Sequence, residues 1–281
     1  MDSNIILGAD SYKFSHFYQD PPGTTLKQSH VVARGINKKF ADYVSEITFF
    51  GLQSFIRERL LKPFTFSQID FAQRFAAKHG VPFNREGWLR ILKTHHGYLP
   101  VMIRALPEGT SVPIGVAQVV VENTDPDFPW LPSYIETELL RSVWYPSTVA
   151  TISRAAKKII LAGLEKTSDD PDGQIGFKLH DFGQRGVSSR ESAGLGGAAH
   201  LVNFLGTDTT EGVLHAMDYY TSPMDATGFS IPAMEHSTVT VWGREHEGDA
   251  FKNMLEKSPG PIIACVSDSY DIYNAAVNIW G

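Results

Sequence analysis

Residues 178–209 read KLHDFGQRGVSSRESAGLGGAAHLVNFLGTDT, and this stretch decides the fold that we expect for the second half of the chain. The apolar positions within 175–180 predict a buried strand, and those within 201–205 predict a second one. Small residues fill the segment between them, and serines suited to an N-cap precede it, so a helix is expected over 188–199. A strand–helix–strand unit of this kind is typical of parallel α/β folds.

Functional side chains follow both expected strands. The first strand leads into Phe182 and Arg185, and the second leads into Asp208. In βα-barrel enzymes the strands hold the geometry, and the loops at their carboxyl ends carry the chemistry. The sequence therefore predicts that these two loops form one site.

The polar segment TSDDPDG at 167–173 is the predicted boundary between an N-terminal domain, 1–170, and a second domain, 171–281. In the N-terminal domain the pattern predicts a strand and a surface turn within 4–19, a strand at 28–33, helices at 49–61, 67–78 and 85–94, β-structure over 99–123, and helices at 133–142 and 148–164. The helix at 67–78 is expected to start at Ser67 as N-cap, to stop at Gly80 and to bury Phe71 and Phe75. The second domain is expected to alternate strands and helices, with further helices at 210–220, from about 247 and at 271–279, and a strand at 261–266.

Composition excludes several classes of protein. A chain of 281 residues that is 42% hydrophobic is long enough for one large or two ordinary packed domains. The net charge of −6 argues against a broad nucleic-acid surface, although a few arginines can still bind a phosphorylated small substrate. A single cysteine, Cys265, excludes an internal disulfide framework and favours a reducing compartment. Neither a signal peptide nor an apolar run of about 18 residues is seen, so we expect a soluble cytoplasmic protein that does not bind membranes.

A further group of candidate residues lies around His236. Glu235 is adjacent to it, and Asp268 follows an apolar run, where a carboxylate can orient an imidazole. A lone histidine beside a loop is more often structural or solvated, and Asp268 is equally suited to N-cap the helix that follows it. Tyr12 likewise belongs either to a surface turn or to a ligand-stacking position. The chain has no HExxH or CxxC pattern, so no protein ligands for a metal are predicted.

Together these motifs resemble the nicotinamide phosphoribosyltransferases, a type II phosphoribosyltransferase family. The resemblance covers nearly the whole chain and is carried by DSYK at 10–13, VENTDP at 121–126, WYPSTVATISR at 144–154, LHDFGQRGVSS at 179–189, LVNFLGTDT at 201–209, SIPAMEHST at 230–238 and VSDSYDIYN at 266–274. It implies an α+β N-terminal domain followed by a parallel α/β barrel. It also implies transfer of a phosphoribosyl group from 5-phosphoribosyl 1-pyrophosphate to nicotinamide, with ATP and Mg²⁺ as cofactors and a homodimer that shares its active sites.

The resemblance also implies roles for individual residues. Phe182 would stack on one face of the nicotinamide ring, Tyr12 of the second subunit would cover the other face, and Asp208 would accept a hydrogen bond from the carboxamide. His236 would be phosphorylated by ATP, with Glu235 and Asp268 supporting it. Further substrate contacts are implied for Arg185 (pyridine or phosphate), Arg34 (phosphate, from the partner chain), Ser230 and Ile231. The sequence HVVA before Arg34 departs from the aromatic and acidic residues that the family tends to have there.

The resemblance implies that the barrel is incomplete in this chain, because the family continues well beyond the position of Gly281 with further phosphate-binding loops. Two classes of function therefore stay open. The first is a nicotinamide enzyme, complete or completed by a second chain, with nicotinate as the neighbouring substrate. The second is a truncated, non-catalytic fragment.

Overall fold

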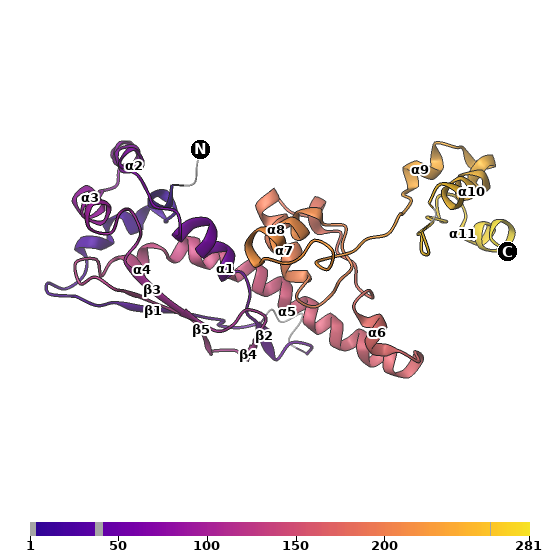
Figure 1. The fold of residues 1–281 in the computed structure, drawn as a ribbon, viewed down its shortest axis with the longest axis horizontal. Helices are drawn as coiled ribbons and strands as arrows, with labels where there is room; N and C mark the ends of the chain where they lie inside the picture. Colours follow the sequence, from indigo (N-terminus) through magenta and orange to yellow (C-terminus); the bar gives the residue numbers. More distant parts are fainter. Residues whose placement is uncertain (1–3, 37–41, 259) are drawn as a thin grey trace. The chain divides into compact units, whose positions relative to one another are not determined.

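The computed structural model describes residues 4–36, 42–258 and 260–281 (Figure 1). The chain divides into two units, one that extends to Gly228 and one that runs from Phe229 to the end. Residues 171–228 thus pack with the N-terminal unit. Whether the protein also has a domain division at 170/171 stays a prediction.

The first unit is built on a three-stranded antiparallel sheet in the order β1-β5-β3, formed by β1 (Gln28–Val32), β5 (Ala117–Asn123) and β3 (Val101–Ala105). A second pair joins β2 (Glu46–Thr48) to β4 (Ser111–Pro113). Alternate residues of β5, Val119 and Val121, are buried against Leu139 and Val143 of the long helix α5. This alternation is expected of a strand with one face on the core, and it confirms the predicted β-structure at 28–33 and 99–123.

Short helices cover the N-terminal end of this unit. The α-helices are α2 (Phe66–His79), α3 (Arg85–Thr94) and α4 (Leu131–Tyr134). Two 3₁₀ segments accompany them, η1 (Ile5–Leu7) and η2 (Ser11–Tyr18). Helix α1 (Leu52–Phe55) continues as a π-helical turn over Ile56–Leu60. Trp88, Trp130 and Tyr134 pack edge to face in the core beneath them.

Three sequence predictions need correction here. The expected strand within 4–19 is helical, because Asn4 accepts a hydrogen bond from the backbone of Ile6 and starts a turn. Helix α2 is capped by Thr65, whose hydroxyl and whose partner Gln68 form a capping box, so Ser67 is not the cap. Phe71 and Phe75 are partly exposed and are not core residues. The predicted stop at Gly80, which has a φ of +83°, is confirmed.

Helix α5 (Glu136–Thr167) is one helix of 32 residues, where the sequence predicted two. The gap between the two predicted helices, 143–147, lies inside this helix and includes Pro146, which removes a backbone donor. The helix continues because neighbouring hydroxyls bind both its own backbone and that of the adjacent segment. Ser147 Oγ accepts from Phe50 N at 3.0 Å, and Thr151 Oγ1 accepts from Thr48 N at 2.9 Å. Tertiary contacts therefore override the local effect of the proline.

Three helices follow α5 in this unit: α6 (Pro171–Ile175), α7 (Arg190–His200) and α8 (Thr210–Tyr220). The last two confirm the predicted helices. The strands predicted within 175–180 and 201–205 are wrong as regular strands, since Ile175 ends a helix and 201–203 form a turn. A single parallel bridge between Asp181 and Thr207 takes their place.

Close contact between α7 and α8 explains the small residues of this stretch. A Cβ built at Gly197 would lie 2.7 Å from the Cα of Gly212, and one at Gly212 would lie 2.6 Å from the Cα of Gly197. The two backbones thus touch, as glycine alone permits.

The second unit contains α9 (His236–Thr240), the 3₁₀ turn η6 (Arg244–His246), α10 (Glu247–Lys257) and α11 (Ile272–Asn274), which continues as a π-helical turn over Ala275–Ile279. The helices predicted from about 247 and at 271–279 are confirmed. The strand predicted at 261–266 is reduced to a parallel bridge between Ala233 and Ala264. Mixed helix and sheet is thus confirmed, whereas the parallel barrel stays a prediction. Within the described ranges, no helix is both long and apolar enough to cross a membrane.

Candidate active site

The bridge between Asp181 and Thr207 brings the two functional loops of the first unit together. The Asp181 backbone N–H donates to Gly206 O at 3.2 Å, and the Asp208 N–H donates to Asp181 O at 2.8 Å. Phe182 and Asp208, the residues that follow the two bridged positions, are therefore held side by side. The predicted meeting of these two loops is confirmed, although single-residue pairing achieves it in place of regular strands.

His180 links these two side chains. Its Nε2 lies 3.5 Å from Asp208 Oδ1, and its ring centroid lies 4.9 Å from that of Phe182 at an interplanar angle of 41°. Phe182 is 62% exposed, and the side chain of Asp208 is 38% exposed. An exposed aromatic ring beside an accessible carboxylate can hold a flat ligand that carries a hydrogen-bond donor. Sequence reasoning did not single out His180, because its place between the two loops depends on the bridge.

Side chains from both sides of the bridge fix the loop around Phe182. Asp181 Oδ1 accepts from the Gly183 N–H at 2.8 Å. Gln184 Oε1 accepts from the Thr210 hydroxyl at 3.0 Å and from the Glu211 N–H at 3.2 Å, both in the first turn of α8. The loop is therefore attached to the start of the helix that follows Asp208.

A buried histidine supports the second loop. His200 Nε2 donates to Gly206 O at 3.0 Å, since a carbonyl can only accept. Burial lowers the pKa of His200, which favours the neutral imidazole with its proton on Nε2. The carbonyl before Thr207 is thus fixed from inside the unit.

The other predicted ligand residues of this unit are more scattered. Arg185 lies exposed in the short 3₁₀ turn Gly183–Gly186, and in the described parts of the chain it forms no ion pair. Tyr12 lies in η2, is exposed and has Lys13 Nζ 5.3 Å from its ring centroid. No ring contact between Tyr12 and Phe182 occurs in the described residues. The role of Tyr12 in a partner's site stays a prediction.

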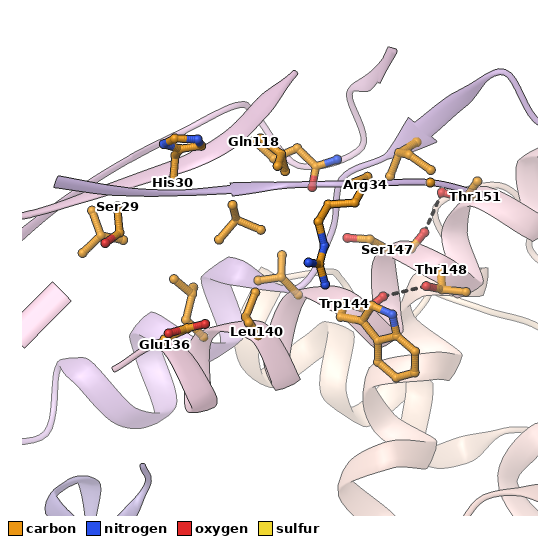
Figure 2. A pocket seen from close by; sticks show the side chains of 18 of the residues that line it. Ser29, His30, Arg34, Gln118, Glu136, Leu140, Trp144, Ser147, Thr148 and Thr151 are labelled. Carbon is orange, nitrogen blue, oxygen red and sulfur yellow. Dashed lines mark hydrogen bonds between the residues drawn. The ribbon is translucent and has the colours of Figure 1, made fainter. Parts of the chain in front are cut away.

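Arg34 lies elsewhere, in a groove of about 1020 Å³ between β1, β5 and α5. Figure 2 shows its side chain directed from the end of β1 toward the part of α5 that carries Leu140 and Trp144. Gln118 Nε2 is also buried in the wall of this groove, without a hydrogen-bond partner in the part of the chain that the structure describes. The structure therefore does not bring Arg34 to Phe182.

In the second unit, His236 and Asp268 form a pair. His236 Nε2 lies 2.9 Å from Asp268 Oδ1, and both side chains are largely exposed. Asp268 is not the cap of the helix that follows it, because Asp271 Oδ1 accepts from the first N–H groups of α11. The interpretation that pairs Asp268 with a histidine is therefore the one that agrees with the geometry.

The other candidate residues of the second unit, Glu235, Ser230 and Ile231, lie in or just before helix α9. Glu235 is the N-cap of α9, and its carboxylate accepts from Ser237 Oγ at 2.5 Å. It thus fixes the start of the helix on which His236 lies. Ser230 and Ile231 lie exposed in the extended segment before that helix. No group of three or more potential metal ligands occurs among the residues described.

Comparison with known proteins agrees with these motifs. The model of the nicotinate phosphoribosyltransferase family matches residues 177–281, and the model of the N-terminal domain of nicotinamide phosphoribosyltransferase matches residues 4–103. A nicotinamide phosphoribosyltransferase of Xanthomonas campestris is 52% identical over 280 residues, which cover 99% of this chain and 58% of that protein. One from Acinetobacter baylyi is 33% identical, covering 96% of this chain and 55% of that protein.

The chain is a homologue of the nicotinamide phosphoribosyltransferases. It spans little more than half the length of these relatives. The crystal structure of human nicotinic acid phosphoribosyltransferase is similar in fold, with a TM-score of 0.55 at 20% identity, over 83% of this chain and 40% of that one. Both the sequence similarity and the similarity in fold therefore support a type II phosphoribosyltransferase fold for this homologue.

Proposed function

We propose that this homologue takes part in the transfer of a phosphoribosyl group from 5-phosphoribosyl 1-pyrophosphate to nicotinamide, giving nicotinamide mononucleotide and pyrophosphate for NAD biosynthesis. The observation that carries the proposal is the arrangement of Phe182 and Asp208 around His180, in a chain that is 52% identical to a nicotinamide phosphoribosyltransferase.

In this reaction no covalent bond forms between the substrates and Phe182 or Asp208. The pyridine nitrogen forms a bond to C1 of the ribose as the bond to pyrophosphate breaks, and the centre between them has oxocarbenium character. The protein therefore acts mainly by positioning the ring and by stabilising charge. Stacking on Phe182 adds about 0.5–1.5 kcal/mol beyond area burial. Asp208 accepts a hydrogen bond from the carboxamide and repels the carboxylate of nicotinate.

We assign the coupling to ATP to His236. With its Nε2 turned to Asp268, the imidazole presents Nδ1 as the nitrogen that would take the phosphoryl group. Asp268 orients the ring and stabilises positive charge on it, and Glu235 fixes the helix that carries it. Mg²⁺ would be held largely through phosphate oxygens, which suits a chain whose described side chains offer no three-ligand cluster.

The assembly that we propose is a cytoplasmic homodimer with shared sites. Tyr12 and Arg34 would reach the partner's site, and Ser230, Ile231 and Arg185 would line the substrate pocket. The second unit and residues 171–228 would contribute to a parallel barrel of the type II kind, completed by polypeptide equivalent to the rest of the relatives. That polypeptide would be part of the same protein or of a second chain.

A nicotinate phosphoribosyltransferase is the second candidate, because the family model over residues 177–281 is that of the nicotinate enzymes. The position of Asp208 beside Phe182 argues against it, since nicotinate would bring a second carboxylate to the same place.

The test is an assay of mononucleotide formation by liquid chromatography, with nicotinamide or nicotinate as acceptor and with or without ATP. We expect product from nicotinamide and a higher rate with ATP. A preference for nicotinate would establish the second candidate. No product from either acceptor, even when the remaining part of the Xanthomonas relative is supplied as a separate chain, would identify this polypeptide as a non-catalytic fragment.

A further inference from the structure

We infer that His180 is a positioning residue that sets both the direction of the Asp208 carboxylate and the tilt of the Phe182 ring for a pyridine carboxamide. This inference rests on the proposed function, whose assigned ligand residues are Phe182 and Asp208 and do not include His180.

The first step of the argument is that one imidazole contacts both groups. Its Nε2 faces Asp208 Oδ1 at 3.5 Å, while its ring lies 4.9 Å from the ring of Phe182. The contact through Oδ1 restricts rotation of the carboxylate about its side-chain bonds. The contact therefore favours one acceptor direction before a ligand binds, which lowers the cost of ordering it.

The second step is that the imidazole packs directly on the backbone at Gly206. A Cβ at Gly206 would lie 2.7 Å from His180 Nδ1, so any side chain there would displace the imidazole. Gly206 does not have a positive φ, so the backbone conformation is not what requires a glycine. The imidazole itself provides the reason for the glycine.

The third step concerns the rigidity of the support. Gly206 is fixed by two hydrogen bonds to its carbonyl oxygen, one from Asp181 N at 3.2 Å and one from His200 Nε2 at 3.0 Å. His200 is buried, and burial lowers the pKa of its imidazole, which favours the neutral form. His180 therefore packs on a backbone that is held from inside the unit, whereas Phe182 and Asp208 reach solvent.

The two contacts of His180 can be separated by substitution. His180→Gln keeps a nitrogen donor for Asp208 and removes the ring, whereas His180→Phe keeps a ring beside Phe182 and removes the donor. Gly206→Ala displaces the imidazole without changing it. His246→Ala is the control for removal of a histidine that is paired with an aspartate, because His246 pairs with Asp249 at 2.8 Å and is not among the residues of the proposed site.

The measurements are nicotinamide KM and kcat at saturating 5-phosphoribosyl 1-pyrophosphate, the nicotinamide-to-nicotinate ratio of kcat/KM, and thermal unfolding. We expect His180→Phe and Gly206→Ala to raise the nicotinamide KM about tenfold and to reduce the ratio, with kcat changed less than KM. His180→Gln should retain the ratio while still raising KM. His246→Ala should match the parent in all three measurements.

Two results would overturn the inference in an active enzyme. One is a nicotinamide KM within twofold of the parent in both His180 variants. The other is an equal loss in all His180 and Gly206 variants that follows their unfolding temperatures, which a merely structural role predicts. If the parent chain turns over neither acceptor, nicotinamide binding by saturation-transfer NMR replaces KM. No binding by the parent then refutes the proposed function, whereas parental binding that the variants retain unchanged refutes the role of His180.

Discussion

Replacing Gly197 with alanine should destabilise the first unit, because the α7–α8 contact leaves no space for a methyl group. The added Cβ would lie 2.7 Å from Gly212 Cα and 2.9 Å from Thr209 Cγ2. Carbon atoms in contact lie about 3.5–4.0 Å apart, so the two helices must separate by about 1 Å. Overpacking of this kind costs about 1–3 kcal/mol, and a contact with backbone falls at the upper end because no rotamer change relieves it.

The intrinsic helix propensity of alanine opposes this cost by about 1 kcal/mol, so we expect a net loss of about 2 kcal/mol in the free energy of unfolding. Gly163→Ala is the matched control, because Gly163 lies in helix α5 with no atom within 4 Å of a Cβ built there. It should gain about 1 kcal/mol. Urea unfolding followed by circular dichroism gives both values. A Gly197→Ala protein as stable as the parent would refute this account of the helix contact.

Three further predictions concern the sites. Asp208→Asn should relax discrimination against nicotinate, because it removes the charge that repels the acid; an unchanged ratio of kcat/KM for the two acceptors would contradict the assigned role. His236→Ala should abolish stimulation by ATP and leave basal transfer, and full ATP coupling in this variant would exclude the phosphohistidine. His215 is buried with no partner for Nε2 within the described residues, and burial lowers its pKa to about 4. The folded state favours the neutral form of His215, whereas the unfolded chain takes up a proton below pH 6.5. The free energy of unfolding is therefore unaffected by His215 above pH 6.5 and falls by about 3 kcal/mol as the pH decreases toward 4. Acid titration of urea unfolding should therefore show a shallower loss over that range in His215→Leu than in the parent.

Several helices were predicted well because local chemistry sets their boundaries, although the cap of α2 was placed at Ser67 and is Thr65. Asn84 caps α3 and Gly80 ends α2 through hydrogen bonds or dihedral angles that involve only neighbouring residues. The gap predicted between 142 and 148 was wrong because hydrogen bonds from Thr48 and Phe50, about a hundred residues away in the chain, support α5 there.

The strands around the candidate site were harder to predict for a related reason. An apolar run becomes a strand only when a partner strand is available, and the described residues supply one bridge at Thr207 and one at Ala264. The loops were nevertheless correctly expected to meet, because Phe182 and Asp208 follow the bridged positions. The place of His180 depends on contacts between loops, which a single sequence does not encode locally. The pairing of Asp268 with His236 was one of two interpretations that the sequence left open, and the contact between their side chains decides for it.

The continuity of α5 has a consequence for communication within the first unit. At 1.5 Å per residue its 32 residues extend about 48 Å. Its first half packs under the sheet through Leu139 and Val143, and its middle packs on α7 through Ala150. An unbroken helix transmits a shift of one end to the other with little bending. Changes in the buried face of the sheet should therefore alter the geometry of the loop before α7, so that the proposed selectivity for nicotinamide would respond to substitutions far from Phe182.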